Sequence, residues 1–258
     1  MPHECEWHKP DGQNFASIMH TLSSKGTVQG LLLYGGTIGL ADMFDNGTLG
    51  FGLWPKDWPM WGQVILALVA AEFGLYWAHR WAHERAFLWR FHAVHHSVTK
   101  LWFLNTGRFH FVDSLVSILL GLAILLPLGA PMEVVKWMSA ITAFIGMLTH
   151  CNVEMRTGVL NYIFNTPGLH RWHHSKELHE GNRNYGENLM CWDLVFNSFY
   201  NADYRPPVDI GTKDYVPVSF WKQLLWPFLP NSIKKKLQPD FEPLPFGREE
   251  DKPKRFGF

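Results

Sequence analysis

Three short clusters contain most of the histidines of this chain. They read HRWAH, HAVHH and HRWHH, and eleven of the 14 histidines lie between His79 and His179. Positions three and four apart fall on one face of a helix, so each H-x-x-H-H is expected to offer three imidazoles to one point. With the single histidine at 150, the candidate metal ligands are His79, His83, His92, His95, His96, His150, His170, His173 and His174.

The number of candidate ligands indicates more than one metal ion. A structural zinc takes four ligands and a catalytic zinc three from the protein, so nine imidazoles are too many for one ion. The sequence therefore predicts a pair of transition-metal ions. Isolated histidines are more often hydrogen-bonded or surface residues, so we expect His3, His8, His20 and His179 not to bind metal. Replacing His3 or His8 should have little effect.

The composition fits a membrane protein better than a nucleic-acid-binding one. The 258-residue chain has a formal net charge of zero, so no long-range attraction to nucleic acid is expected. Aromatic residues make up 15% of the chain, which is high for a soluble enzyme and common at membrane interfaces. The three cysteines are too scattered for a disulfide framework or a CxxC zinc site.

Four stretches are apolar enough to enter a bilayer. They are residues 27–44, 62–78, 115–131 and 133–149, and each has about the minimum length of a span. The alternative is four buried helices of a soluble bundle, since the mean hydropathy of the whole chain is only −0.09. The distribution of positive charge decides between these two interpretations.

With four spans and both termini on one side, the outer loops are roughly 45–61 and 130–134. Of the 23 Lys and Arg residues, only Lys56 lies in these loops, and Lys136 lies just inside the fourth span. This bias predicts that the histidine clusters and both termini are cytosolic. The expected fold is an all-α integral membrane protein with a histidine-ligated dimetal site in a cytosolic helical cap. We expect one domain over 1–258, with the cap formed by 79–111 and 150–230 and a charged tail over 231–258.

The clusters alone leave the metal open, because imidazole suits zinc, copper, iron and nickel. An apolar substrate can reach a site at the end of membrane helices, and its inert C–H bonds require oxidative chemistry, for which non-haem iron and O₂ are the usual agents. Zinc would instead indicate a membrane hydrolase that uses a metal-bound water. A metal transporter or store without catalysis is the third possibility, although it would place its ligands within the spans.

The order of the motifs resembles the fatty acid hydroxylase/sterol desaturase superfamily. The matching text is YWAHRWAHE, LWRFHAVHHS, TGRFH, THCNVE, TPGLHRWHHS and NRNYGENLMCWDLVF, which covers about residues 70–200. The HRxxHE pattern and the single His150 are most similar to the alkylglycerol monooxygenase-like or bacterial sterol desaturase-like branch. Many members end the last motif with Gly-Thr, where this chain has Asn197 and Ser198.

This resemblance implies a membrane enzyme in which the histidines hold two iron ions. Such an enzyme uses O₂ and two external electrons to hydroxylate or desaturate a lipid, for example a sterol, a fatty acyl chain, an ether lipid, a carotenoid or an aminolipid. The chain carries no recognisable cytochrome b5-like haem segment. We therefore expect the electrons to come from a separate cytochrome b5-like or ferredoxin-like protein.

Two glutamates near the first cluster are candidates for catalytic or supporting roles. Glu72 lies seven residues before His79, on the same helical face and within a span. An unpaired carboxylate there is costly, so we expect Glu72 to accept a hydrogen bond from a ligand imidazole. Glu84 directly follows His83, so it points away from that ligand but could reach another.

A third candidate, Asn184, belongs to an Asn-Tyr-Gly sequence that predicts a turn with Gly186 at positive φ. Glu154, four residues after His150, is either a ligand or a hydrogen-bond partner of a ligand. Supporting or headgroup-binding roles are also considered for Arg108, His110 and Asp193.

Overall fold

The chain folds almost entirely into helices, as the sequence predicts. The computed structural model describes residues 1–32, 43 and 50–241. Within that part no strand forms, and two isolated β-bridges join Phe164 to Leu189 and Ser175 to Ile210. The α-helices are α1 (Asn14–Met19), α2 (Thr27–Gly30), α4 (Met60–Glu84), α5 (Ala86–His96), α6 (Phe111–Leu128), α7 (Met132–Thr149), α8 (Pro167–His173), α9 (Leu178–Gly181), α10 (Cys191–Val195), α11 (Phe220–Leu225) and α12 (Asn231–Leu237). A π-helical segment, His20–Gly26, joins α1 to α2, and short 3-10 turns span Cys5–His8, Phe103–Asn105, Gly158–Tyr162 and Trp226–Phe228.

Helices α4, α6 and α7 are long and apolar enough to cross a membrane. They contain 25, 18 and 18 residues, which corresponds to about 37, 27 and 27 Å against a hydrocarbon core of about 30 Å. Large apolar side chains on their outer faces remain exposed: Ile65 is 55%, Leu119 50% and Phe144 63% accessible. A soluble bundle would bury such faces, so the described part of the chain is that of a membrane protein with three candidate spans.

The helix boundaries differ from the predicted spans in two places. Helix α4 continues past the predicted 62–78 span to Glu84, so the first histidine cluster extends the membrane helix and does not open a separate cap segment. Helix α6 ends at Leu128 because Gly129 adopts the left-handed conformation, with φ 84°, which stops a helix. The first predicted span, 27–44, lies mostly outside the described residues, so the count of four spans stays a prediction.

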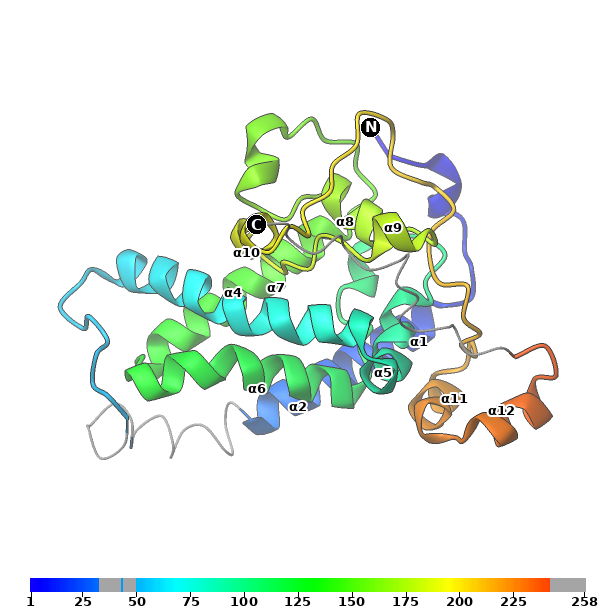
Figure 1. Cartoon of the computed structure of the whole chain (residues 1–258), viewed down its shortest axis with the longest axis horizontal. Helices are drawn as coiled ribbons and strands as arrows, with labels where there is room; N and C mark the ends of the chain where they lie inside the picture. Colours follow the sequence, from blue (N-terminus) through cyan, green and yellow to red (C-terminus); the bar gives the residue numbers. More distant parts are fainter. Residues whose placement is uncertain (33–42, 44–49, 242–258) are drawn as a thin grey trace, which may run out of the picture.

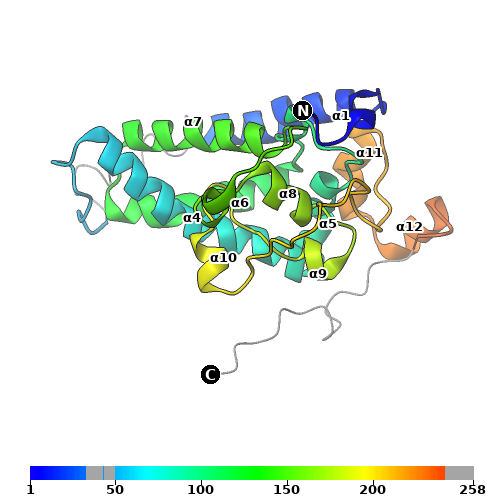
Figure 2. The same cartoon turned by 90° about the horizontal axis from the view of Figure 1, so that it is seen from above.

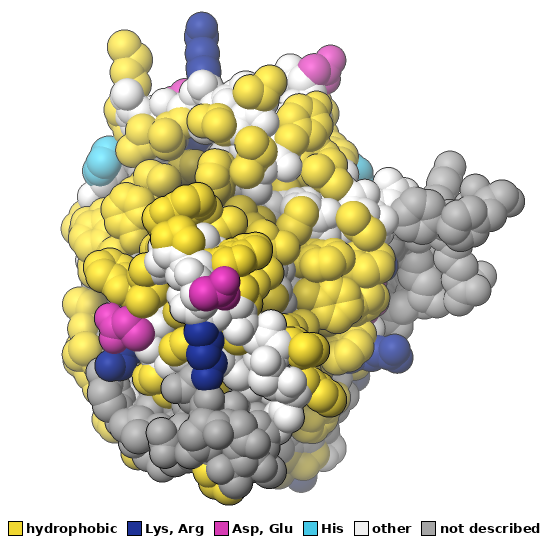
Figure 3. Space-filling view, turned by 90° about the vertical axis from the view of Figure 1, so that its left-hand side faces the viewer, with side chains coloured by type: hydrophobic (Ala, Val, Ile, Leu, Met, Phe, Trp, Pro, Cys, Tyr) yellow, Lys and Arg dark blue, Asp and Glu magenta, His cyan; other side chains and the backbone are white. Residues whose placement is uncertain are grey.

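The long helices and the short ones occupy different ends of the molecule. Figures 1 and 2 show that α4, α6 and α7 extend side by side. The short helices α5, α8 and α9 gather near one end of these long helices. Figure 3 views the molecule from the far end of the long helices, where hydrophobic side chains cover most of the described surface. The carboxyl ends of α4 and α7 and the amino end of α6 meet beside the short helices, which places the histidine clusters at one end of an apolar bundle.

Close packing fixes α4 against α6. A Cβ atom on Gly74 would lie 2.0 Å from the carbonyl oxygen of Leu120, so only glycine fits at this contact. Towards the far end, buried apolar side chains of α4, α6 and α7 form one cluster that includes Val64, Ala67, Ala71, Leu122, Leu125, Val134, Val135 and Met138. This packing sets the register between α4, which carries two candidate ligands, and α6.

The N-terminal segment is attached to the cap by a buried histidine. His3 Nδ1 lies 2.6 Å from Glu154 Oε2, and His3 is only 2% exposed. The backbone N–H of Glu4 also donates to the side chain of Asn152. His3 thus anchors the segment and joins neither metal nor surface, and the small effect expected of its replacement stays a prediction. Glu154, considered above as a ligand or a ligand's partner, instead pairs with His3.

Candidate metal centre

The nine predicted ligand histidines come together in two buried groups. Each of the nine is at most 8% exposed. Within each group the candidate ligand atoms all lie within 4.8 Å of one another. Group one consists of His79, His83, His92, His96 and His173. Group two consists of His95, His150, His170 and His174.

The two H-x-x-H-H motifs do not aim three imidazoles at one point, so that expectation is wrong. In HAVHH, His92 and His96 belong to group one, whereas His95 belongs to group two. In HRWHH, His170 and His174 belong to group two, whereas His173 belongs to group one. Side chains four apart on a helix diverge by about 40°, whereas adjacent ones diverge by about 100°. Each motif therefore supplies both groups, and the rings of His96 and His174, one from each group, stack with centroids 4.4 Å apart.

Four of the five imidazoles of group one are held through Nδ1. The acceptors of His79, His83, His92 and His173 are, in turn, the carbonyl of Tyr185 (2.7 Å), Oδ1 of Asn182 (3.0 Å), Oδ2 of Asp113 (2.8 Å) and the carbonyl of Arg183 (2.8 Å). Because oxygen accepts in these bonds, Nδ1 carries the proton and Nε2 keeps a free lone pair. In the described structure the Nε2 atoms of all five rings are buried without a hydrogen-bond partner.

Group two has fewer supporting contacts. His150 Nδ1 donates to the carbonyl of Gly146 at 2.8 Å. His170 Nε2 lies 3.1 Å from Nε2 of His150 and 3.1 Å from Nε2 of His174. Lone pairs that converge at such distances repel unless a proton or a cation lies between them. The Nδ1 atoms of His95, His170 and His174 are buried and have no partner among the described residues.

Burial keeps the cap imidazoles neutral. Burial first, and neighbouring histidines second, hold the pKa of five ligands well below the usual value: His95, His96, His170, His173 and His174. Burial also lowers the pKa of His150 to about 4. A histidine must be unprotonated to bind a metal, so at neutral pH these imidazoles need release no proton first.

The donor set fits two transition-metal ions. Both groups consist of imidazoles alone, which suit zinc, copper, iron and nickel and do not suit the oxygen-seeking calcium and magnesium. Buried nitrogens without a partner are costly, and a metal ion in group one would bind the unpartnered Nε2 atoms there. In group two a metal ion would lie between the converging Nε2 atoms of His150, His170 and His174.

Glu72 does not contact a ligand imidazole, contrary to the prediction. This fully buried carboxylate accepts hydrogen bonds from the backbone N–H groups of Glu187 (2.5 Å) and Asn188 (3.1 Å) and from the side-chain amide of Asn188 (2.8 Å). Seven residues correspond to about 10 Å along a helix, which is too far for the carboxylate to reach His79. Glu72 instead holds the loop at 187–188 against α4.

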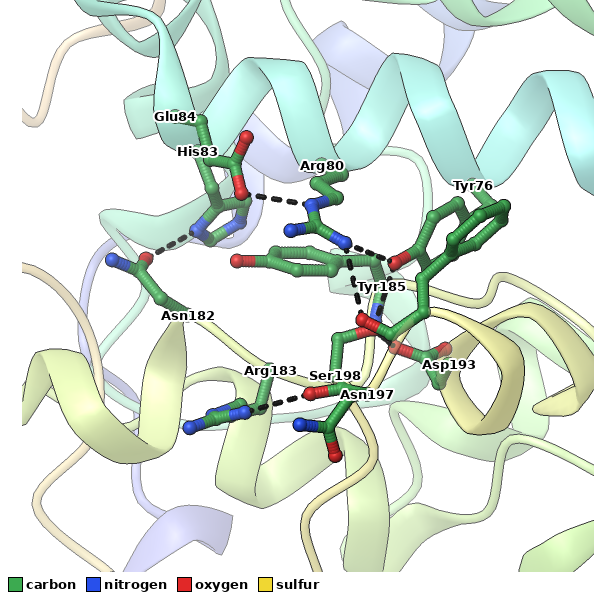
Figure 4. Close-up of polar contacts among 11 residues, drawn as sticks. Tyr76, Arg80, His83, Glu84, Asn182, Arg183, Tyr185, Asp193, Asn197 and Ser198 are labelled. Atoms are coloured by element: carbon green, nitrogen blue, oxygen red, sulfur yellow. Dashed lines mark hydrogen bonds and ion pairs between the residues drawn. The ribbon is translucent and has the colours of Figure 1, made fainter. Parts of the chain in front are cut away.

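Glu84 also lies outside both groups. Its Oε1 accepts from Arg80 Nε at 2.8 Å, one turn earlier on α4, and its side chain is 33% exposed. Arg80 donates in addition to the hydroxyl of Tyr76, which lies 2.8 Å from the hydroxyl of Ser198 (Figure 4). This series of polar contacts joins α4 to the segment around Ser198 and does not reach a ligand.

Asn184 supports a loop and does not face the metal groups. Its amide donates to the carbonyls of Leu169 and Tyr200, and its Oδ1 accepts from the backbone N–H of Tyr200. Positive φ occurs at Asn184 (54°) and not at Gly186, as asparagine tolerates the left-handed region. Gly186 is required for a different reason, since a Cβ there would lie 2.2 Å from the carbonyl oxygen of Leu189.

Asp193 fixes the same loop from the other side. Its carboxylate accepts from the N–H groups of Tyr185 (2.8 Å) and Gly186 (2.7 Å) and from the hydroxyl of Ser198 (2.6 Å) (Figure 4). Burial raises the pKa of Asp193 to about 6, although these hydrogen bonds oppose the rise. Asn197 takes a positive φ of 55°, a conformation that asparagine tolerates better than most residues. Asn197 and Ser198 thus form the turn here, at the position where many members of the similar superfamily have Gly-Thr.

Three residues beside group one were not singled out from the sequence. Asp113 and Asn182 each accept a hydrogen bond from a ligand, and the ring of Tyr185 lies 5.4 Å from that of His83. The Tyr185 hydroxyl is buried and has no hydrogen-bond partner in the described structure. Asp113 lies in the first turn of α6, so a third span predicted to begin at 111 would have included it as a carboxylate within a span, like Glu72. Asn182 and Tyr185 approach the ligands only through long-range folding, which leaves no pattern in the local sequence.

The remaining candidates have structural contacts. His20 bonds to the side chain of Gln223 at 2.9 Å, and His110 accepts from the backbone N–H of Val112 at the start of α6. Arg108 is fully buried and donates to the carbonyl of Val94. Five histidines join neither group: His3, His8, His20, His110 and His179.

A cavity lies between α4, α6 and α7, and we name it the membrane cavity. Apolar side chains such as Leu75, Ile118 and Met138 form much of its wall. It adjoins a second, smaller space at the ligands His79, His92, His95, His150 and His170. The two spaces share Lys25, Phe109, Ser117, Thr142 and Glu187. The membrane cavity therefore adjoins the candidate metal centre.

A third space reaches group one from a different side. It is lined by the ligands His83, His96 and His173 and by polar residues that include Lys176 and Lys213. It shares no lining residue with the membrane cavity, so the metal centre has a polar approach as well as an apolar one.

Comparison with known proteins gives a consistent family assignment. A model described as fatty acid hydroxylase matches residues 64–198. The chain is 54% identical over 231 residues to the ornithine lipid hydroxylase OlsE of Rhizobium tropici, covering 88% of this chain and 70% of that protein. It is 31% identical over 183 residues to the alkylglycerol monooxygenase of Danio rerio, covering 68% of this chain and 38% of that protein. It is 30% identical over 148 residues to the human alkylglycerol monooxygenase, covering 57% of this chain and 32% of that protein. No solved structure matches significantly.

Proposed function

The chain belongs to the fatty acid hydroxylase family, and on this premise we propose that it is a di-iron monooxygenase that uses O₂ to hydroxylate a membrane lipid. The observation that carries the proposal is the junction of nine buried imidazoles, in two groups, with a cavity between membrane helices. Desaturation of the same lipid is the closest alternative outcome, because the two reactions differ only in the fate of a neighbouring hydrogen.

In this proposal group one and group two each hold one iron ion through imidazole nitrogen. The two ions, when bound, supply the activation of O₂ that oxidation of an inert C–H bond requires. The residues behind the ligands set their orientation: Asp113 keeps the proton of His92 on Nδ1, and Asn182 does the same for His83. Phe109, stacked 4.2 Å from His95, covers group two with an apolar surface that limits access of water.

The two rival functions account less well for the site. A catalytic zinc of a membrane hydrolase needs three protein ligands and an open position, which leaves most of the nine imidazoles without a role. A transporter needs ligands along a path through the spans, whereas seven of the nine ligands lie beyond the long helices, on α5, α8 and at His150. A metal store would have no need of an apolar cavity.

We propose an ornithine-containing lipid as the first substrate to test. The relative that shares 54% identity is named for hydroxylation of an ornithine lipid. Two of the other relatives are named alkylglycerol monooxygenases, so ether lipids, fatty acyl lipids and sterols form the comparison set.

A separate electron-transfer protein, of the cytochrome b5 or ferredoxin type, is proposed to deliver two electrons per turnover. The polar space at Lys176 and Lys213 reaches three ligands of group one and offers an approach that the lipid does not occupy.

We further propose that the clusters and both termini are cytosolic and that 27–44 forms a fourth span. Cysteines placed in 50–58 of a variant lacking Cys5, Cys151 and Cys191 should react with impermeant reagents from outside the cytosol. Labelling of this segment only from the cytosolic side would contradict the proposed topology.

The function is tested by lipid analysis of cells. Cells that express the chain should contain a lipid with a mass gain of one oxygen, derived from O₂, that is absent when His83→Ala or His170→Ala is expressed at the same level. A lipid with a loss of two hydrogens would indicate desaturation. Unchanged lipids, in a host that makes ornithine, ether and sterol lipids and contains iron-loaded protein, would contradict the proposed function.

A further inference from the structure

Two oppositely charged side chains face the passage between the membrane cavity and group two. Lys25 and Glu187 line both of the adjoining spaces. Lys25 Nζ lies 4.7 Å from the centre of the Phe109 ring, and that ring stacks on the ligand His95. Glu187 belongs to the loop whose backbone is held by the buried Glu72. Lys25 is therefore positioned close to the metal ligands by the contact of its ammonium with Phe109, and Glu187 by the backbone of its loop.

Neither charge has a direct ion-pair partner among the residues that the structure describes, although Lys25 attracts Glu187 across the passage. Among the residues that the structure describes, Lys25 contacts the face of Phe109 but forms no ion pair, and no ion pair involves Glu187. Both side chains are half-buried. A cation and an anion in a partly buried passage are costly when unpaired, and a ligand that carries the opposite charges would compensate both.

Two hydroxyl groups in the same cavity also lack partners. Ser114 Oγ and Thr142 Oγ1 are buried without a hydrogen bond in the described structure, and both residues line the membrane cavity. A purely aliphatic ligand would leave these hydroxyls unsatisfied. An amide or ester group, which links acyl chains to a headgroup, would accept their hydrogen bonds.

We propose that Lys25 and Glu187 bind a zwitterionic lipid headgroup, with its ammonium at Glu187, its acidic group at Lys25 and its acyl chains in the membrane cavity. The inference rests on the proposed lipid hydroxylation and names its substrate class. Acyl amino acids and phosphoethanolamine lipids share this chemistry. Sterols and alkylglycerols carry neither charge, and a free fatty acid lacks the ammonium, so the pair selects against all three.

The test measures lipid binding by native mass spectrometry of the full-length, detergent-solubilised, iron-loaded protein. The probes are an acyl-ornithine lipid, its N-acetyl derivative, its methyl ester and dioleoyl phosphatidylethanolamine. The wild type should bind the free acyl-ornithine lipid roughly tenfold more tightly than either capped derivative, since each cap removes one charged hydrogen bond. Glu187→Gln should abolish only the preference over the N-acetyl derivative, and Lys25→Gln only the preference over the methyl ester.

Glu133→Gln and Lys136→Gln are matched controls, since these residues form an exposed pair on α7 outside the cavity and should leave both preferences intact. Comparable binding of phosphatidylethanolamine would extend the anionic group to phosphate, and weak binding would restrict it to carboxylate. If both cavity variants keep both preferences and the wild-type iron content, the inference is wrong. Hydroxylation by the wild type is measured separately. Hydroxylation without charge-selective binding would overturn this inference alone. Charge-selective binding without hydroxylation would overturn the proposed function alone.

Discussion

The two histidine groups contain the same kind of ligand but are supported to different degrees. In group one, four of five imidazoles have Nδ1 fixed by an oxygen acceptor, which comes from α6 or from the 182–185 segment. In group two, His150 alone has an equivalent bond to a carbonyl, and three rings have an unpartnered Nδ1. Hydrogen-bond partners behind a ligand raise its basicity and fix its orientation. Group one is therefore the preorganised half of the centre.

The less supported group borders the apolar approach alone. The space that adjoins the membrane cavity is lined by His95, His150 and His170 of group two and also by His79 and His92 of group one. The polar space is lined by ligands of group one only, which are His83, His96 and His173. Where a lipid must approach the ligands, there is less room for protein groups that could form hydrogen bonds with those ligands. We therefore infer that group two has fewer supporting bonds because it borders the proposed substrate path.

The largest expected effect is the loss of a ligand from either group. His83→Ala and His170→Ala should each lower lipid hydroxylation by about a hundredfold or more, because a missing ligand costs at least as much as a missing partner behind it. Activity is measured in membranes at equal protein level. His179→Ala is the control, as this side chain is 68% exposed and outside both groups. Full activity of His170→Ala would show that group two is not needed.

The two groups should release iron at different rates. A chelator added to the iron-loaded protein should remove one iron per chain roughly tenfold to a hundredfold faster than the other, the usual consequence of lost supporting bonds. His170→Ala should lack the fast phase and His83→Ala the slow phase. A single release rate for both ions would contradict the difference in support.

Removal of one support from group one should make it resemble group two. Asp113→Asn keeps the shape of the side chain but loses the charge that holds the proton of His92 on Nδ1. We expect a loss of iron affinity of about tenfold to a hundredfold in group one, with group two unchanged. The chelator assay checks this, since the slow phase alone should become faster. Acceleration of the fast phase alone would exchange the roles of the groups.

The smallest effect is expected from the acids on α4. Glu72→Leu leaves two backbone N–H groups of the 187–188 loop without an acceptor, at a cost of about 1–3 kcal/mol per group. Thermal unfolding in detergent should occur at lower temperature, and hydroxylation should fall by about tenfold. Glu84→Leu removes only a partly exposed pair with Arg80 and should change either quantity little. Equal effects of the two substitutions would contradict the loop-anchoring role of Glu72.

The sequence predicted which histidines lie together far better than it predicted their arrangement. Histidine spacing and the apolar stretches were sufficient to identify the helical membrane fold and the nine residues that the structure brings together. The division between two groups could not be read from the spacing, because it depends on the orientation of α5 and α8 about the centre. The partner of Glu72 lies 115 residues away on a loop, and local pattern carries no signal for such a contact. The same holds for Asn182 behind His83.

Iron content tests the two-group account most directly. The wild-type chain, loaded with iron under anaerobic conditions and freed of loosely bound metal, should contain about two iron ions per chain, and His83→Ala and His170→Ala about one each. Elemental analysis of the three purified proteins gives these values. One zinc ion and no iron in the wild type, after the same loading, would contradict the di-iron account.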